Sequence, residues 1–294
     1  MGKSFIDMET GEIVEVAWYR TDQQQHQITE YKKQQQRKEK LYEMIRQHSG
    51  TFFFYRYDKL LEQLDDDTEV GFRFLYLCSK ANPDGTITAY ENRLCKTIED
   101  FTYVFDKTIS TVSKYMNTMI NNKLIYKDGG VYRINPLYYY TKLDNSNKYN
   151  SIRTFNKAIQ ELYNNSNPKE HKLMGQLIKL TPYINIHNNI LCWNPEETNI
   201  DLIVPLSSKD IQNIFKPDSN YGYELFHKFE KVYIKGEPVM GIFRAVGEVH
   251  YVINPRVFYR GNDYKELQSL IDQFDIAKYQ ATKTTRRKMT ITKE

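Results

Sequence analysis

The stretch "TISTVSKYMNTMINNKLIYKDGGVYRINP", Thr108 to Pro136, is the part of the sequence from which the fold can be worked out. Apolar side chains recur in its first half at intervals of three and four residues, which predicts an amphipathic helix. They are Val112, Tyr115, Met116 and Met119. Two short strand-like runs then flank Asp128-Gly129-Gly130, a combination typical of a tight β-hairpin. The stretch therefore predicts a helix followed by a two-stranded ribbon.

The sequence before this stretch predicts the other elements of a compact domain. Phe52 to Phe54 indicate a strand that leads into a short helix, and "DDDTEVGFRFLYLCSKA" predicts a buried helix of about three turns behind a Thr68 or Asp67 cap. A short strand starts at Thr86, and "IEDFTYVFD" gives a short helix that turns into the longer one near Asp106 to Thr108. Helix, helix, strand, short helix, second helix and ribbon is the order of a winged helix-turn-helix domain.

An Ile-Asn-Pro tripeptide followed by aromatic residues occurs twice, at Ile134–Pro136 and at Ile253–Pro255, an offset of 253 − 134 = 119 residues. Aligning Phe105 with Phe215 places Met116 over Phe226 and Met119 over Phe229 at an offset of 215 − 105 = 110. The core positions of two helix pairs then coincide, and the second hairpin is longer by about nine residues, in the regions where duplicated domains differ most. We expect the proline to end each hairpin, because it cannot donate to a strand ladder. The aromatic residues then fold back over the open edge.

Between the repeats, the sequence predicts a helix over "IRTFNKAIQELYNN". The second block follows with a helix over "HKLMGQLIKLTPYI", a short strand over "DLIVPL", a capped short helix over "SSKDIQNIF" and a longer helix over "NYGYELFHKFEKVYI". A hairpin with Gly247 near its turn ends this block, and an amphipathic helix over "NDYKELQSLIDQFDIAKY" follows.

The expected fold is α+β and helix-rich, with two tandem winged helix-turn-helix domains, an N-terminal polar helix and a linking helix. We assign residues 1–50 to an N-terminal arm and Gln/Lys-rich helix, 51–143 to the first winged-helix domain, 144–167 to a linker and connecting helix, 168–262 to the second domain, and 263–294 to a C-terminal helix and basic tail. Residues 22–47 lack Gly and Pro, which favours a solvated helix. Disorder in its first half and a coiled-coil-like contact with a partner stay open.

Composition excludes several classes of function. The formal net charge of +4 permits an anionic partner without requiring one, and the 24 tyrosines suit a binding protein. No apolar run is long enough for a membrane span or a signal peptide, so we expect a cytoplasmic protein without a membrane partner. The 3 cysteines are far apart and sit among apolar neighbours, which indicates buried free thiols.

The sequence carries no motif for catalysis. There is no Gly-rich phosphate-binding loop, and the 6 histidines never occur at the spacing of metal ligands or of the metal site of a strand-nicking enzyme. A helix N-terminus accounts for the carboxylates of "DDDTE". We therefore expect no enzyme activity, no cofactor and no metal.

A winged-helix reading assigns the candidate DNA contacts. In the first domain the second helix enters the major groove and the hairpin contacts the backbone. The candidates are Lys107, Thr108, Ser110, Thr111, Ser113 and Lys114 at the groove, with Lys127, Arg133 and Lys142 on phosphates. In the second domain they are Lys216, Ser219, Asn220, Tyr221 and Tyr223, backed by Arg244, Arg256 and Arg260, and in the tail Arg286, Arg287 and Lys288. Two plainer explanations stay open: Ser110 and Thr111 as helix caps, and the tail as a solvated segment.

The block Phe52 to Tyr140, about a third of the chain, resembles the winged-helix domain of replication initiator proteins from plasmids and phages of low-GC Gram-positive bacteria. "TISTVSKYMNTMINNKLIYKDGGVYRINP" carries most of the likeness, and the opening "FIDMETGEIVE" is similar to the start of many such proteins. Initiators with two winged-helix domains in tandem exist in that family, and the repeat fits them. The second helix pair departs from the pattern, because "KPDSNYGYELF" is more aromatic and less basic than a typical reading helix.

The leading hypothesis is sequence-specific binding of double-stranded DNA, as a replication initiator or a transcription regulator of a phage or plasmid. A homodimer is possible. The competing hypothesis is a protein–protein module that binds a host polymerase or replication protein, because winged helices are reused in that way and fold does not fix function. The surface of the two helix pairs discriminates between them: basic faces favour DNA, whereas a neutral aromatic face favours a protein partner.

Overall fold

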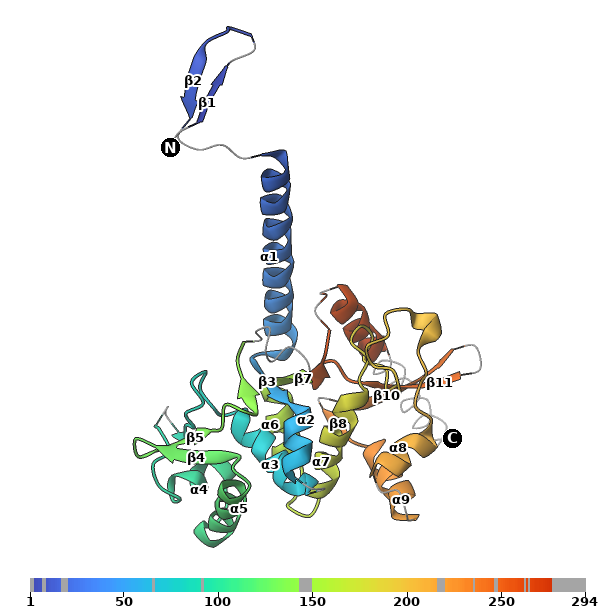
Figure 1. Ribbon diagram of the computed structural model, residues 1–294. Helices are drawn as coiled ribbons and strands as arrows, with labels where there is room; N and C mark the ends of the chain where they lie inside the picture. The colour runs from blue at the N-terminus through green and yellow to red at the C-terminus, as the bar shows by residue number, and fades with distance from the viewer. Residues whose placement is uncertain are drawn as a thin grey trace, which may run out of the picture.

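The computed structural model describes residues 3–6, 9–16, 21–64, 67–90, 93–142, 150–215, 220–234, 236–245, 248–261, 263 and 265–276. The fold is α+β, with helices and small antiparallel sheets (Figure 1). Among these residues, no helix combines the length and the apolar character that a bilayer span requires.

The N-terminal region consists of a hairpin and one long helix. Strands β1 (Lys3–Ile6) and β2 (Ile13–Val16) pair antiparallel around a turn. Helix α1 (Asp22–Ser49) is continuous over 28 residues and projects from the body of the molecule (Figure 1). It starts with a capping box, in which Thr21 and Gln24 each accept a hydrogen bond from the other's backbone N–H. The predicted polar helix is confirmed.

The first half of the body follows the predicted order. Its elements are β3 (Phe52–Arg56), α2 (Tyr57–Leu64), α3 (Thr68–Cys78), α4 (Asp100–Phe105), α5 (Ile109–Asn121), β4 (Ile125–Asp128), β5 (Val131–Ile134) and β6 (Tyr139–Tyr140). The side chain of Asp67 caps α3 by accepting from the backbone N–H of Val70, as expected. The predicted strand at Thr86 is reduced to isolated bridges, one of which joins Thr86 to Arg133 of the hairpin.

The second half repeats this order. Its elements are β7 (Ser151–Phe155), α6 (Asn156–Asn165), α7 (His171–Leu180), the 3-10 helices η2 (Thr181–Tyr183) and η3 (Ile200–Leu202), α8 (Ser208–Phe215), α9 (Asn220–Phe229), β8 (Tyr233–Ile234), β9 (Glu237–Pro238), β10 (Met240–Ala245), β11 (Glu248–Ile253) and β12 (Phe258–Tyr259). A helix over residues 265–276 follows. The extra length of the second half near its hairpin goes into the small β8–β9 pair and into longer hairpin strands.

Two predicted elements of the second half were wrong. The helix expected from residue 152 begins only at Asn156, because Ser151–Phe155 pairs with strands on both sides and is buried throughout. The strand expected over residues 201–206 is reduced to an isolated bridge between Pro205 and Cys192, and its first two residues belong to η3. There the Asn199 side chain accepts from the backbone N–H of Asp201, which favours a turn, and Pro205 lacks the N–H that a strand ladder requires.

A four-stranded antiparallel sheet joins the two halves, with the order β12-β7-β3-β6. At its centre Phe54 lies opposite Arg153, and on the outer sides Tyr140 pairs with Phe54 and Tyr259 with Arg153. The register is symmetric, because Phe54 of β3 is equivalent to Arg153 of β7 and Tyr140 of β6 is equivalent to Tyr259 of β12. A pseudo-two-fold operation therefore relates the two halves. The segment assigned to a linker thus supplies β7, the counterpart of β3. The aromatic residues after each Ile-Asn-Pro form the edge strands of this sheet.

The asparagine of each tripeptide builds the turn from hairpin to sheet. The side-chain oxygen of Asn135 accepts from the backbone N–H of Leu137, and that of Asn254 accepts from Arg256, each at 2.9 Å. The backbone N–H groups of the two asparagines donate to Leu124 and Val239, at 2.9 and 2.8 Å. This asparagine turn acts in addition to the proline, which we expect to end the hairpin because it cannot donate to a strand ladder.

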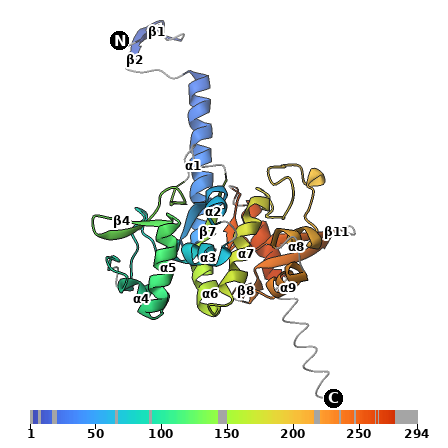
Figure 2. The ribbon, with the colours of Figure 1, turned by 60° about the horizontal axis from the view of Figure 1, so that its bottom comes forward.

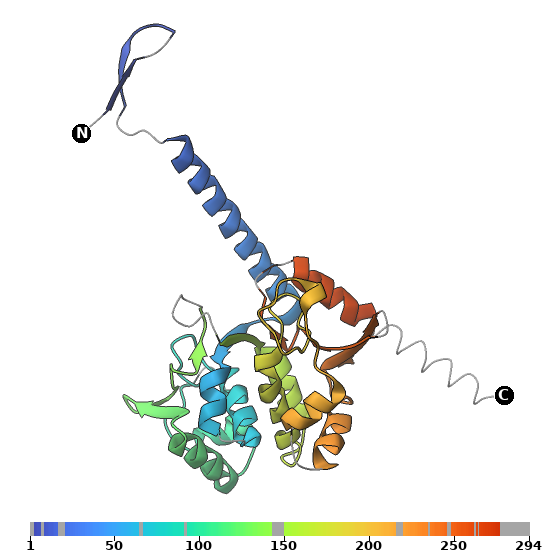
Figure 3. The same ribbon diagram turned by 45° about the vertical axis from the view of Figure 1, so that its right-hand side comes forward.

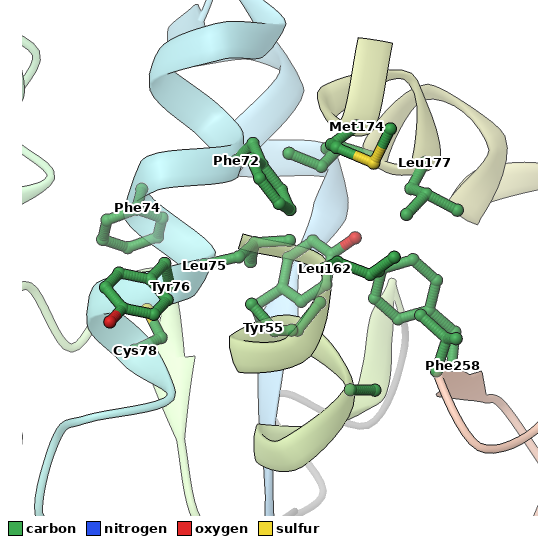
Figure 4. Close-up of a cluster of buried hydrophobic side chains, with 14 of the residues drawn as sticks. Tyr55, Phe72, Phe74, Leu75, Tyr76, Cys78, Leu162, Met174, Leu177 and Phe258 are labelled. Carbon is green, nitrogen blue, oxygen red and sulfur yellow. The ribbon is translucent and has the colours of Figure 1, made fainter. Parts of the chain in front are cut away.

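Helices α3 and α7 form the core between the halves, where Phe72, Leu75, Leu177 and Leu162 of α6 gather over Tyr55 of the sheet (Figure 4). The helices approach closely because Gly71 of α3 and Gly175 of α7 lie at the contact. The pairs aligned from the sequence, Phe105 with Phe215, Met116 with Phe226 and Met119 with Phe229, are all buried. The expected correspondence of core positions is confirmed.

Candidate nucleic-acid interface

Helix α5 is held with one face on the core and the other exposed. Val112, Tyr115, Met116 and Met119 are buried, as predicted. Phe105 of α4 packs edge-on against Tyr115, with 5.5 Å between ring centroids. Asp106 adopts a left-handed conformation, φ 49°, that turns the chain sharply between α4 and α5. The turn lies where the sequence placed it.

The exposed face of α5 carries a row of polar side chains: Ser110, Lys114, Asn117 and Asn121. Their spacing of four, three and four residues places them on one side of a helix. The helix contains no acidic residue. Sequence reasoning found Ser110 and Lys114 but missed Asn117 and Asn121, although the same spacing could have identified them.

The N-terminus of α5 is open to a ligand. Thr108 is the N-cap residue, yet its side chain makes no capping hydrogen bond. Its hydroxyl lies 3.3 Å from that of Ser110 and 3.1 Å from that of Thr111. These hydroxyls therefore contact one another, whereas a cap would accept from the first backbone N–H groups. Lys107, half-buried, precedes them, and Ser113 and Thr111 lie at the margin of the exposed face. The geometry suits an anion at this end of the helix.

The β4–β5 hairpin lies next to α5. Lys127 is exposed, with its ammonium group 5.1 Å from the centroid of the Tyr132 ring. Arg133 differs from the expectation, since its guanidinium lies 3.3 Å from the carboxylates of both Asp84 and Asp128. Arg133 thus braces the hairpin against the loop that carries Asp84. Lys142 is exposed but follows β6, so it belongs to the edge of the central sheet and is not part of the hairpin.

A buried polar cluster supports α5 from behind. Arg73 of α3 lies over the ring of Tyr115, with 3.7 Å from its guanidinium carbon to the ring centroid, and forms an ion pair with Glu69. The Arg73 Nε donates to Nδ1 of His171 at 3.3 Å. Burial, reinforced by the positive charge of Arg73, lowers the pKa of His171 to about 4. His171 is therefore neutral near pH 7 and accepts this hydrogen bond.

The lowered pKa predicts a pH-dependent stability. The unfolded chain, with an ordinary histidine pKa near 6.5, binds more protons than the folded chain between about pH 4 and 6.5. The free energy of unfolding should therefore fall by up to about 3 kcal/mol as pH is lowered through this window. Urea unfolding at pH 4 and pH 7 measures this fall. The variant His171→Gln, which cannot titrate, should show a clearly smaller fall, and an equal fall in both proteins would contradict the assignment.

Helix α9, the counterpart of α5, presents a different surface. Its exposed side chains are Tyr221, Tyr223, Glu224, His227 and Lys228. At the offset of 110, Glu224 stands where α5 has Lys114. Tyr223 packs edge-on against His227 at 4.2 Å, and Nδ1 of His227 lies 2.9 Å from a carboxylate oxygen of Glu230. This face is aromatic and carries both signs of charge.

The remaining residues predicted for the second half divide into three groups. Lys216 and Ser219 lie outside the described residues, as does the side chain of Asn220 at the start of α9. Arg244 of β10 is exposed. Arg256 and Arg260 have intramolecular partners. Arg286, Arg287 and Lys288 of the tail lie outside the described residues.

Arg256 and Arg260 are bound by carboxylates of the chain itself. The Nη1 of Arg256 lies 2.8 Å from Glu237, and its Nη2 lies 3.3 Å from Asp275. Arg260 pairs with Glu196 and donates to the backbone oxygen of Ile184 at 2.9 Å. The side chains are only 15% and 7% exposed, and cations at such depth need partners within the fold. Both arginines therefore stabilise the fold through these ion pairs, and their predicted support of DNA contacts stays a prediction.

The two helix pairs lie on the same side of the body. In Figures 1 and 3, α5 and α9 both lie opposite the attachment of α1, and Figure 2 shows them flanking the central α3, α6 and α7. Helices α5 and α9 thus lie on opposite flanks of the same side of the body, with α3, α6 and α7 between them (Figures 1 and 2).

Within the described residues, no group of three or more His, Cys, Asp and Glu side chains could hold a metal ion. Cys78, Cys95 and Cys192 are free and buried, as predicted. In comparisons with known proteins, the chain matches no family, no curated protein and no solved structure.

Proposed function

We propose that the protein binds double-stranded DNA at specific sequences through two winged-helix modules. The observation that carries the proposal is the exposed face of α5, a row of Ser110, Lys114, Asn117 and Asn121 on a helix without acidic residues and with an uncapped N-terminus. Lysine pairs with guanine, asparagine pairs with adenine in two hydrogen bonds, and serine contacts several bases. The row therefore has the chemistry for reading base edges.

The arrangement of each half supports winged-helix modules. In the first half, α3, α4 and α5 are followed by the β4–β5 hairpin, and the bridge Thr86↔Arg133 adds a third strand segment. In the second half, α7, α8, α9 and the β10–β11 hairpin follow the same order, with the bridge Ile190↔Val252. In such modules the second helix of the pair enters the major groove.

The pseudo-two-fold relation supports binding to two half-sites by one chain. Dimeric helix-turn-helix proteins place two symmetric helices in successive major grooves, about 34–36 Å apart. The present chain carries two such helices on one side of its body. Because α5 and α9 differ on their exposed faces, the two half-sites should differ in sequence, unlike those of a true palindrome.

A second candidate function is favoured by α9. Its face combines Tyr221 and Tyr223 with the opposite charges of Glu224 and Lys228. Aromatic side chains are enriched at protein–protein contacts, whereas a carboxylate disfavours the approach of phosphates. In this alternative, the second module binds a host polymerase or replication protein, and the first alone binds DNA.

The biological role follows from the DNA that is bound. A replication initiator of a phage or plasmid would bind its origin, and a transcription regulator would bind a promoter. Cross-linking the protein in its own host cells and sequencing the attached DNA separates the two roles. Recovery of random sequence, or of no DNA, would contradict the proposal.

The tail provides a further prediction under the proposed function. Removing Lys283 to Glu294 deletes five basic residues, which are Lys283, Arg286, Arg287, Lys288 and Lys293. Binding should weaken evenly across DNA sequences, and the dependence of log K on log salt should become less steep by about one unit for each lost phosphate contact. Titrations at several salt concentrations measure this slope. If the slope were unaffected by the deletion, the tail would be a solvated segment.

A further inference from the structure

The loop between Leu191 and Leu206 is an insertion relative to the first half. The backbone N–H of Leu206 donates to Leu191, as that of Cys95 donates to Ile87, so these two pairs are equivalent. The second pair is 206 − 191 = 15 residues apart and the first pair 95 − 87 = 8. The second half thus carries seven additional residues at a position where the first half closes the same loop without them.

The insertion exposes apolar side chains. Trp193, Ile200, Leu202 and Val204 are 53%, 66%, 59% and 52% exposed. Hydrogen bonds and an aromatic contact nevertheless hold the loop in a defined conformation. Trp193 donates its backbone N–H to Val204 at 2.9 Å, and the Asn194 side chain bridges Leu202 and Val204 at 2.8 Å each. Tyr183 packs edge-on against the indole of Trp193 at 5.5 Å. Four large apolar side chains held exposed by an ordered loop indicate a docking surface.

The charges around this surface indicate which kind of segment binds to it. Glu196, Glu197 and Asp201 lie within the same loop, and the charge of Glu196 is already paired with Arg260. Acidic residues at the rim exclude nucleic acid, and they disfavour a symmetric contact with the same surface of a second copy, because like charges would meet. The surface fits a basic segment that also carries apolar side chains.

One segment of this chain has that composition. Residues 277–294 contain Lys278, Lys283, Arg286, Arg287, Lys288 and Lys293 against the single acidic Glu294, together with Met289 and Ile291. From residue 276 to Met289 is 13 residues, which span at most about 45 Å when extended. Arg260, which lies just before the helix over residues 265–276, pairs with Glu196 of the loop, and this helix is only about 18 Å long. The segment is therefore long enough to reach the loop from the end of the helix.

We propose that the C-terminal segment 277–294 docks on the exposed loop formed by Trp193, Ile200, Leu202 and Val204. Met289 and Ile291 cover the apolar side chains, and the basic residues face Glu197 and Asp201. In Figures 1 and 3 the gold segment that carries η3 lies on the side of the body to which α1 is attached, opposite α5 and α9. Docking there holds the basic segment away from the helix pairs until anionic phosphates compete for it.

Fluorescence of Trp193 in the full chain tests the proposal directly. The chain has 2 tryptophans, so Trp18→Phe leaves Trp193 as the only indole. The Trp18→Phe protein is the parent, and it is to be compared with the same protein that also carries Met289→Ser and Ile291→Ser. In the parent, Trp193 emission should be blue-shifted and its quenching by acrylamide about half as strong, because docking removes solvent from a half-exposed indole. Adding the peptide 277–294 should restore the parent emission, whereas the peptide with both serines should not.

Further observations decide between docking and its alternatives. Asp201→Asn should reduce the blue shift of Trp193 emission at low salt, because it removes a negative charge at the edge of the apolar surface. The double variant Ile200→Ser with Leu202→Ser should abolish the blue shift of Trp193 emission. Circular dichroism checks that this variant folds. Identical Trp193 emission in the parent and in the Met289→Ser and Ile291→Ser protein at low salt would overturn the proposal. A difference that appears only at high protein concentration would overturn docking within one chain. No DNA is used, so the outcome is independent of the proposed function.

Discussion

Under the proposed function, replacing both Ser110 and Lys114 with alanine should abolish the preference for the target DNA and leave the fold intact. Both side chains lie on the exposed face of α5 and take no part in the core. Each good contact to a base edge is worth about 1–3 kcal/mol of discrimination, so the ratio of specific to non-specific affinity should fall by about 10²-fold or more. Gel shifts with the cross-linked sequence and with scrambled DNA measure this ratio, and thermal unfolding checks the fold.

The matched control is Lys32→Ala, which also removes an exposed lysine from a helix, but from α1, which is attached to the side of the body opposite α5 (Figure 1). It should leave the ratio unchanged. Asn117→Ala should lower the ratio less than the double variant, because one contact is lost. If the double variant kept the full sequence preference, α5 would not be the reading helix. A loss confined to non-specific affinity would instead limit Lys114 to contacts with phosphates.

Gly175→Ala should be strongly destabilising, and more so than the same substitution at Gly71. A Cβ at residue 175 would lie 2.0 Å from the carbonyl oxygen of Thr68 and 2.5 Å from its carbonyl carbon. These are backbone atoms of α3, so no rotamer change relieves the contact, and the two helices must separate. We expect a loss of about 3 kcal/mol or more in the free energy of unfolding, even after the higher helix propensity of alanine is counted. Urea unfolding measures the loss.

Gly71→Ala is the internal comparison, because Gly71 lies on the other helix of the same contact. Its added Cβ would meet the side-chain ends of Leu64 and Ile178, at 2.5 and 2.7 Å, and these ends can rotate. The loss should therefore be distinctly smaller, about 1 kcal/mol. Equal losses at the two positions would contradict the close approach of the α3 and α7 backbones at Gly175.

The first half of the fold could be predicted well from the sequence because its elements depend on local patterns. Val112, Tyr115, Met116 and Met119 share one helix face, and Gly129 and Gly130 supply the positive φ angles of the hairpin turn. The second half was less predictable. The sequence predicts a helix over the residues that form strand β7, because a strand buried on both faces loses the alternation that identifies a half-buried one.

The candidate site was predictable where it follows one helix and unpredictable where it depends on distant partners. Lys107 to Lys114 come from consecutive residues around the start of α5, so their grouping follows from the helix itself. Arg256 and Arg260 were expected to contact DNA, yet Glu237, Asp275 and Glu196 neutralise them. A basic side chain in a sequence carries no indication of which carboxylate the fold brings to it.

The sequence alone determined the order of the elements, the repeat and the inward faces of α5 and α9, because hydrophobic spacing and turn residues act over short distances. Only the tertiary structure decided how the two repeats combine. The pairing of Phe54 with Arg153 joins both halves in one sheet, and the glycine contact between α3 and α7 sets their separation. Contacts between residues about a hundred positions apart depend on packing in three dimensions, which no local pattern encodes.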